Sequence, residues 1–161
     1  MSNHRIALVI GPPANGKSSS LRNLKKPKGV VVFNTDRKDL PFKSEFMNVP
    51  INDPYEILSY MDEIATQPKD ICHTIIIDTI TFLMDMFETK YVVNAVNTQA
   101  MWGQYAQFYK QVIDKALAMD KNVIFLAHEK KVMNSDEMVL ETKVPVKGSV
   151  GATGVNFCAL I

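Results

Sequence analysis

The sequence is short of several residue types and patterns, and each shortage argues against a class of protein. It contains only two cysteines, Cys72 and Cys158, and no cysteine–histidine cluster with metal-ligand spacing, which argues against a disulfide scaffold and a zinc site. Both cysteines lie in apolar runs, so we expect buried free thiols. No apolar run approaches the roughly 18 residues that span a bilayer, and residues 1–5 contain no signal-peptide core. We therefore expect a cytoplasmic protein with no membrane partner.

An excess of charge of one sign is also lacking. The 161 residues include 18 Lys and Arg and 17 Asp and Glu, a formal net charge of +1, so any nucleic-acid binding must come from local patches. One such patch is formed by Arg22, Lys25, Lys26 and Lys28. We interpret it as a solvated helix end, with nucleic-acid contact as the alternative. The length predicts one domain over residues 1–161.

The most informative stretch lies near the N-terminus. It reads Gly11-Pro12-Pro13-Ala14-Asn15-Gly16-Lys17-Ser18 and fits the phosphate-loop pattern G-x-x-x-x-G-K-[ST] at every required position. Residues 6–10 predict a buried strand before it, and residues 18–25 predict a helix after it, which is the context that the motif requires. We assign ATP binding to residues 11–18 and Ser19. The loop amides would hold phosphate oxygens, Lys17 would reach the β- and γ-phosphates, and Ser18 would ligate Mg²⁺.

Three further apolar runs predict strands that end in polar residues. Residues 29–33 precede a polar cluster that contains Asp36, residues 74–77 lead into Asp78, and residues 123–127 end at His128. An acidic residue at the end of an apolar strand is the usual partner of a phosphate loop, so we expect Asp78 to hold Mg²⁺. The carboxyl edge of a parallel sheet is where such strands present ligands.

Weaker patterns predict the remaining elements. Asp53, Pro54 and Glu56 predict the start of a helix that ends before Pro68. Another helix is expected after Thr79 with Phe82, Leu83 and Met86 on its apolar side, then an irregular segment over 88–101 and a helix over 102–119 whose aromatics belong to the core. A hairpin over 132–147, a Gly-rich segment over 148–154 and an apolar strand over 155–161 complete the chain. That last strand either closes a sheet edge or marks a truncated C-terminus.

This order of strand ends resembles the RecA-like ATPase core. More specifically, the chain is similar to the short RecA-like ATPases of bacteriophages, the family linked with single-strand annealing and recombination. The phosphate loop carries the resemblance together with Ile77-Asp78-Thr79-Ile80-Thr81, Trp102-Gly103 and the run 123–129. The resemblance extends from Arg5 to about Ile161. It implies an α/β fold, a three-layer P-loop NTPase core with a mostly parallel sheet. In this core the strand ending at His128 lies between the strand before the phosphate loop and the strand ending at Asp78.

The resemblance also implies roles for individual residues. Asp36 would orient the attacking water and His128 would sense the γ-phosphate, which gives a catalytic set of Lys17, Asp36, Asp78 and His128. The segment 130–154 lies where RecA contacts single-stranded DNA, and RecA-like proteins work as homo-oligomers. Two departures stand out, because RecA has Glu at the position of Asp36 and Gln at that of His128. A phage-encoded protein would act in the host cytoplasm.

The phosphate loop predicts a Mg²⁺-dependent ATPase that binds ATP and ADP, and the resemblance implies a role in phage DNA recombination or single-strand annealing. One alternative is a nucleotide-gated assembly module with little turnover. In its favour, the side chain of Asp36 is one methylene shorter than the glutamate that orients water in RecA. Another is a small-molecule phosphotransferase, although such enzymes clamp phosphates with several arginines and this chain has only Arg5, Arg22 and Arg37. Glu129 is the lesser candidate for orienting water.

Overall fold

A parallel sheet organises the chain. The computed structural model describes residues 3, 5–145 and 147, and its five-stranded sheet has the order β1-β5-β4-β2-β3, with every neighbouring pair parallel. The strands are β1 (Ile6–Gly11), β2 (Val30–Asn34), β3 (Met47–Pro50), β4 (Thr74–Asp78) and β5 (Asn122–His128). Because β5 lies between β1 and β4, the strand order expected from the RecA-like resemblance is confirmed, and so is the α/β fold class.

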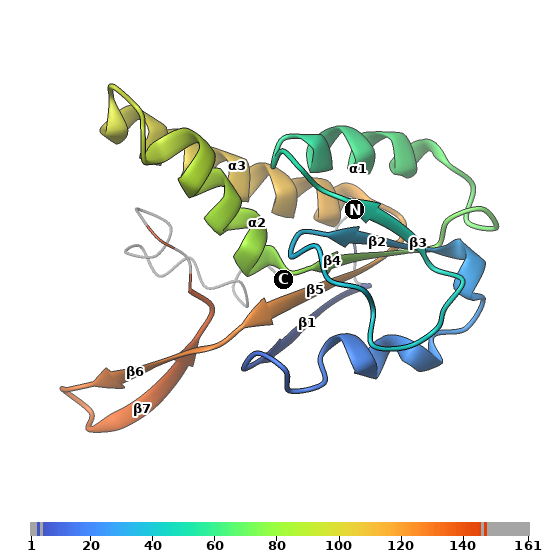
Figure 1. The fold of residues 1–161 in the computed structure, drawn as a ribbon, viewed down its shortest axis with the longest axis horizontal. Helices are drawn as coiled ribbons and strands as arrows, with labels where there is room; N and C mark the ends of the chain where they lie inside the picture. The colour runs from blue at the N-terminus through green and yellow to red at the C-terminus, as the bar shows by residue number, and fades with distance from the viewer. Residues whose placement is uncertain (1–2, 4, 146, 148–161) are drawn as a thin grey trace.

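Helices and a helical turn cover the two faces of this sheet. Figure 1 shows α1 (Glu56–Thr66), α2 (Ile80–Phe87) and α3 (Thr98–Ala118) on one face. The other face is covered by the 3₁₀ helix Ser18–Asn23. The helix predicted over 18–25 therefore exists, but it is shorter and more tightly wound than expected.

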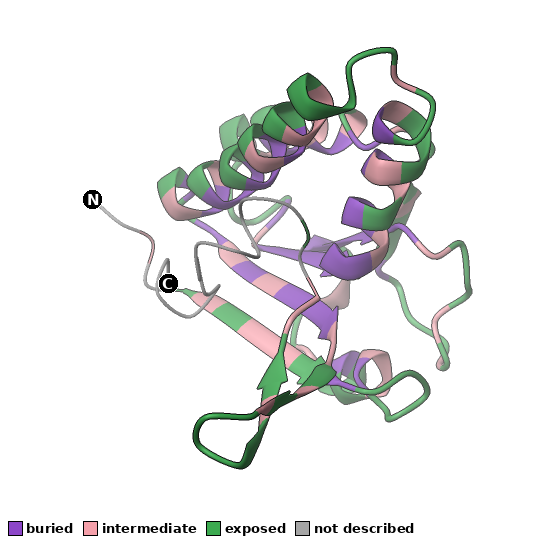
Figure 2. Ribbon diagram, turned by 90° about the vertical axis from the view of Figure 1, so that its left-hand side faces the viewer, coloured by how far each residue is buried: buried purple, intermediate pink, exposed green. Residues whose placement is uncertain are grey.

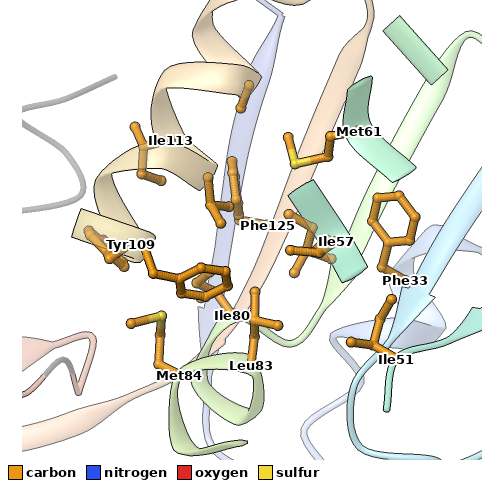
Figure 3. Packing of buried hydrophobic residues seen from close by; sticks show 14 of the residues in the cluster. Phe33, Ile51, Ile57, Met61, Ile80, Leu83, Met84, Tyr109, Ile113 and Phe125 are labelled. Atoms are coloured by element: carbon orange, nitrogen blue, oxygen red, sulfur yellow. The ribbon is translucent and has the colours of Figure 1, made fainter. Parts of the chain in front are cut away.

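The hydrophobic core is divided unequally between the two faces. The larger cluster lies under the three α-helices (Figure 3) and includes Phe33, Leu83 and Phe125, all with no exposed surface. The smaller one contains Leu21, Val30, Val32, Phe46, Ile76 and Leu126. Alternation along β4 sends Ile75 and Ile77 to the large cluster and Ile76 to the small one, as expected for a strand buried on both faces.

Two predictions about burial are corrected. The run 6–10 was expected to be a buried strand, yet the β1 side chains are half-buried or exposed, because β1 is the edge strand of the sheet that the described residues form. The apolar side of α2 is also shifted: Leu83 is buried, whereas Phe82 and Met86 are only half-buried. The buried aromatics Tyr105, Phe108 and Tyr109 of α3 belong to the core, as predicted.

Helix boundaries differ from the sequence patterns in two places. The irregular segment expected over 88–101 is confirmed only for residues 93–97. A π-helical turn (Glu88–Val92) continues α2, and α3 already begins at Thr98. The Asn97 side chain caps α3 by accepting a hydrogen bond from the Ala100 amide at 3.0 Å. At α1 the residues predicted to cap the helix do interact, since Glu56 accepts from the Asp53 amide at 3.3 Å. The helix proper nevertheless begins at Glu56.

Strands β2 and β4 are joined closely at their amino ends. The His73 amide donates to the Gly29 carbonyl oxygen at 2.9 Å, and the His73 ring Nε2 lies 3.0 Å from the carbonyl oxygen of Lys26. A Cβ atom on residue 29 would lie 2.4 Å from the His73 ring. Only glycine therefore allows this close approach.

The predicted hairpin is confirmed. β6 (Lys130–Asn134) and β7 (Val139–Lys143) form an antiparallel pair directly after β5, and Figure 2 shows this pair projecting from the sheet with mostly exposed residues. The predictions for 148–154, for 155–161 and for Cys158 lie outside the described residues. None of the helices in the described part of the chain has the length and apolar character needed to cross a bilayer.

Candidate functional site

The phosphate loop joins β1 to the 3₁₀ helix at the carboxyl edge of the sheet. Its curvature depends on left-handed backbone at two residues, with φ of 61° at Ala14 and 79° at Gly16. Gly16 is the glycine that the motif requires at this position, and such a conformation costs glycine little. The amide of Ser20 donates to the Gly16 carbonyl at 2.9 Å, so the loop passes straight into the helical turn.

Lys17 lies against its own loop. The side chain is buried, with 9% of the residue exposed, and its Nζ donates to the carbonyl oxygens of Gly11 at 2.9 Å and Pro12 at 2.8 Å. Burial lowers the pKa of Lys17, while the nearby carboxylates of Asp78 and Glu129 act to raise it. The ammonium group is thus held by two carbonyl oxygens of the loop. Phosphate oxygens could replace these carbonyls as its hydrogen-bond acceptors.

Ser18 and Asp78 meet as the motif predicts. The Ser18 hydroxyl donates to Asp78 Oδ2 at 2.8 Å. A hydroxyl that donates its proton in this way keeps its lone pairs for a cation, so this pair fits the Mg²⁺ arrangement of P-loop proteins. Burial raises the pKa of Asp78, and the Ser18 hydrogen bond partly opposes that shift. The described residues contain no group of three or more His, Cys, Asp or Glu side chains arranged to hold a metal, so phosphate and water would complete the coordination.

One cleft of about 580 Å³ brings most of the predicted residues together. It is lined by Pro13, Ala14, Asn15, Gly16, Lys17, Ser18, Ser19, Asp36, Lys38, Asp39, Pro41, Asp78, Thr79, Phe82 and His128. Gly11 and Pro12 do not line it, because their carbonyls face Lys17. Asp36, Asp78 and His128 come from the ends of β2, β4 and β5, so the strand order gathers three distant parts of the sequence at one place.

His128 is held by α2. Its amide donates to the Thr81 hydroxyl at 3.0 Å, and its ring meets that of Phe82 edge-on, with centroids 4.9 Å apart. Burial and the charge of Lys17 lower the pKa of His128, against the opposing effect of Asp36 and Asp78. These contributions favour the neutral imidazole, which has one nitrogen that donates a hydrogen bond and one that accepts.

Phe82 lines the cleft and Thr35 connects two of the strand ends that form it. The sequence did not predict these roles. The Thr35 hydroxyl lies 2.9 Å from the carbonyl oxygens of both Asp78 and Thr79, and 2.8 Å from the Thr79 amide. It therefore ties the end of β2 to the end of β4. No local pattern distinguishes this threonine, because its partners lie more than forty positions away. Thr79 caps α2, and its side chain accepts a hydrogen bond from the Phe82 amide. Phe82 could have been assigned to the site only by recognising this cap, because the start of the helix determines which of its residues face the cleft.

The geometry defines a class of protein before any comparison is made. A phosphate loop after an edge strand, a Ser–Asp pair for Mg²⁺ and an inserted strand ending in a polar residue are the features of a P-loop nucleoside triphosphatase. A family model described as an AAA domain matches residues 3–150. The chain therefore belongs to this AAA domain family of P-loop ATPases. A search among curated proteins finds no match.

Proposed function

We propose that the protein is a Mg²⁺-dependent ATPase of RecA-like mechanism that acts on single-stranded DNA in phage recombination or annealing. One observation carries the proposal. The strand order places the phosphate loop, Asp36, Asp78 and His128 around a single cleft. The same order argues against the small-molecule kinase alternative, for which β1 and β4 would be direct neighbours.

Each residue of the cleft has a task in this mechanism. Lys17 and the loop amides bind the β- and γ-phosphates, and Ser18 and Asp78 would hold Mg²⁺, which would neutralise phosphate charge. Asp36, which is half-buried, accepts the proton of an attacking water or orients it. His128, whose backbone amide donates to the Thr81 hydroxyl, donates a hydrogen bond from its ring to the γ-phosphate. Glu129 remains the second candidate for orienting water, since its amide is tied to the Gly11 carbonyl at 3.3 Å.

The hairpin supports a role with DNA and with further copies of the chain. It begins two residues after His128, so a change at the γ-phosphate can reach it directly. Lys130 and Lys143 face each other across the two strands. Exposed apolar side chains, among them Met133, Met138 and Leu140, are of the kind that contact between subunits covers. We expect ATP to stabilise the hairpin of β6 and β7 and hydrolysis to release it.

The first test measures ATP hydrolysis with and without single-stranded DNA, together with the mass of the protein in solution. Stimulation by DNA and assembly with ATP support the proposal. Tight ATP binding with negligible turnover under all conditions would instead favour the nucleotide-gated assembly module, which the short side chain of Asp36 keeps open.

The second test concerns the DNA contact. Lys130→Glu with Lys131→Glu should weaken single-strand binding while ATP affinity stays within a few-fold. The matched control is Lys25→Glu with Lys26→Glu, which reverses the same number of exposed charges in the basic run before β2. The hairpin of β6 and β7 should also gain protection from proteolysis with a non-hydrolysable ATP analogue and not with ADP. Equal protection in all nucleotide states, or a larger loss of DNA binding in the control, would reject the hairpin as the DNA contact.

A further inference from the structure

The turn after β2 is held rigidly although it is exposed. Asn34 is buried, with 8% of its surface exposed. Its side-chain amide donates to the Lys38 carbonyl at 2.7 Å, and its side-chain oxygen accepts from the Arg37 amide at 2.9 Å. The Asp36 carboxylate accepts from the Lys38 amide at 3.0 Å. Three hydrogen bonds thus define a five-residue turn, in which Arg37 takes a left-handed conformation with φ of 59°.

This turn sends its charged side chains in different directions. Asp36 and Lys38 line the nucleotide cleft, whereas Arg37 lines a neighbouring cleft with Asp85 and Lys90. The left-handed backbone at Arg37 allows this separation, and such a conformation is costly for a residue with a side chain. Lys38, and not Arg37, therefore lines the cleft that contains the phosphate loop.

Lys38 also has the freedom that a phosphate ligand needs. Its Nζ lies 3.8 Å from Asp36 Oδ2 and its side chain is 77% exposed, so it forms a loose ion pair that a stronger anion can displace. The flexible four-carbon stem of lysine lets the ammonium move while the backbone stays fixed. The cleft contains one other lysine, Lys17, against the carboxylates of Asp36, Asp39 and Asp78.

We propose that Lys38 is a catalytic residue that binds the γ-phosphate from within the same chain and stabilises the charge that develops on it during hydrolysis. This inference rests on the proposed ATPase function. Lys38 leaves Asp36 when the triphosphate enters, which frees that carboxylate to engage the attacking water. The γ-phosphoryl group is transferred to water, and ADP and inorganic phosphate leave. Two lysines then act on the γ-phosphate: Lys17 from the loop, and Lys38 from the side of β2.

The test compares Lys38→Gln with Arg37→Gln, a matched control that removes the same charge from the adjacent position. Lys38→Gln should lower kcat by at least about 10²-fold, the usual loss on removing one electrostatic donor to a transition state, while the dissociation constant for ATP changes only a few-fold. Arg37→Gln should leave kcat within a few-fold of the parent. Lys38→Arg, which keeps the charge, should recover part of the rate.

A binding measurement separates this role from a structural one. The parent should bind Mg²⁺·ADP with aluminium fluoride, which mimics the transferring phosphoryl group, more tightly than Mg²⁺·ADP alone, and Lys38→Gln should lose most of that difference. The inference would be overturned if Lys38→Gln kept the full difference in affinity between Mg²⁺·ADP with and without aluminium fluoride. It would also be overturned if the parent bound the two ligands equally. Loss of ATP binding in Lys17→Ala together with unchanged turnover in Lys38→Gln would reject the role of Lys38 and leave the proposed function in place. Intact ATP binding and turnover in Lys17→Ala would reject the proposed function itself.

Discussion

β1 and β4 are both short apolar strands that lead into the nucleotide site, yet their surroundings differ. In β4 the four residues before Asp78 are all buried, whereas in β1 no residue before Gly11 is fully buried. β4 pairs with β2 and β5, while in the described residues β1 pairs with β5 alone. An apolar run therefore predicts a strand but not its depth. The phosphate loop follows a partly exposed strand and Asp78 ends a buried one. Matched substitutions in β1 and β4 can measure how much each strand contributes to the free energy of unfolding.

The largest effect on folding is expected from Ile76→Ala in β4. Ile76 has no exposed surface and pairs in register with Val32 and Ile124. Truncating a large buried aliphatic side chain typically lowers the free energy of unfolding by about 2–5 kcal/mol. Urea denaturation of the protein without nucleotide measures the loss. A loss below about 1 kcal/mol would contradict the central position of β4.

Lys17→Ala should affect the ligand and not the fold. Lys17 makes its hydrogen bonds to carbonyls of its own loop and none to the core, so the free energy of unfolding should change by less than about 1 kcal/mol. ATP affinity or turnover should fall by about 10²-fold or more, because a charged phosphate contact is removed. Calorimetric titration with ATP, beside a urea curve, checks both statements. Retained binding and turnover would show that the loop is not the nucleotide site.

Asp78→Asn should raise stability and lower activity together. Because burial raises the pKa of Asp78, its ionised form costs the folded state free energy at pH values above that raised pKa. The amide removes the cost, so we expect the free energy of unfolding to rise at pH 7. The gain should shrink as the pH falls through the raised pKa and disappear well below about 4, the ordinary aspartate pKa, where the carboxyl is neutral in both folded and unfolded chains.

The same substitution should weaken Mg²⁺-dependent turnover while the loop amides keep some nucleotide affinity. In the parent, protons should compete with Mg²⁺ at mildly acidic pH, so the Mg²⁺ concentration for half-maximal rate should rise as the pH is lowered. Thermal unfolding across pH and Mg²⁺ titrations of the rate provide the measurements. A variant with the Mg²⁺ dependence of the parent would remove Asp78 from the metal site.

The smallest effect is expected from Ile10→Ala, which matches Ile76→Ala in chemistry but lies at the exposed end of β1. Ile10 is 37% exposed, so its truncation leaves no closed cavity and should cost less than about 1 kcal/mol. ATP affinity should stay close to that of the parent. Equal losses for the two isoleucines in urea denaturation would mean that β1 is as deeply buried as β4.

Contiguous patterns predicted much of the site. The phosphate loop and the strand ending at Asp78 were located from the sequence because their residue types are set locally, by backbone curvature in one case and by β-branched residues before an acid in the other. β3 was not predicted, since Met47–Pro50 is short, mostly exposed and ends in proline. The π-helical turn Glu88–Val92 was missed because its charged and polar residues hide the buried Val92.

Contacts between distant segments account for the rest. The Thr35 hydroxyl, the ring of Phe82 on His128 and the presentation of Lys38 all depend on how β2, β4 and β5 are aligned. Spacing along the chain contains no information on that alignment. The resemblance to RecA-like proteins supplied the strand order, and only the structure shows which side chains the order brings together.

The close approach of Gly29 and His73 lies at the end of the sheet opposite the site, yet it affects the position of the site residues. With His73 seated on residue 29, β2 and β4 are aligned so that Asn34 pairs with Asp78. A shift of one residue would turn every β2 side chain to the opposite face, and the turn that carries Asp36 and Lys38 would move with it. The residue at position 29 thus affects the placement of cleft residues a full strand length away. In a mutational survey scored by ATP turnover, it should be as intolerant as the phosphate loop itself.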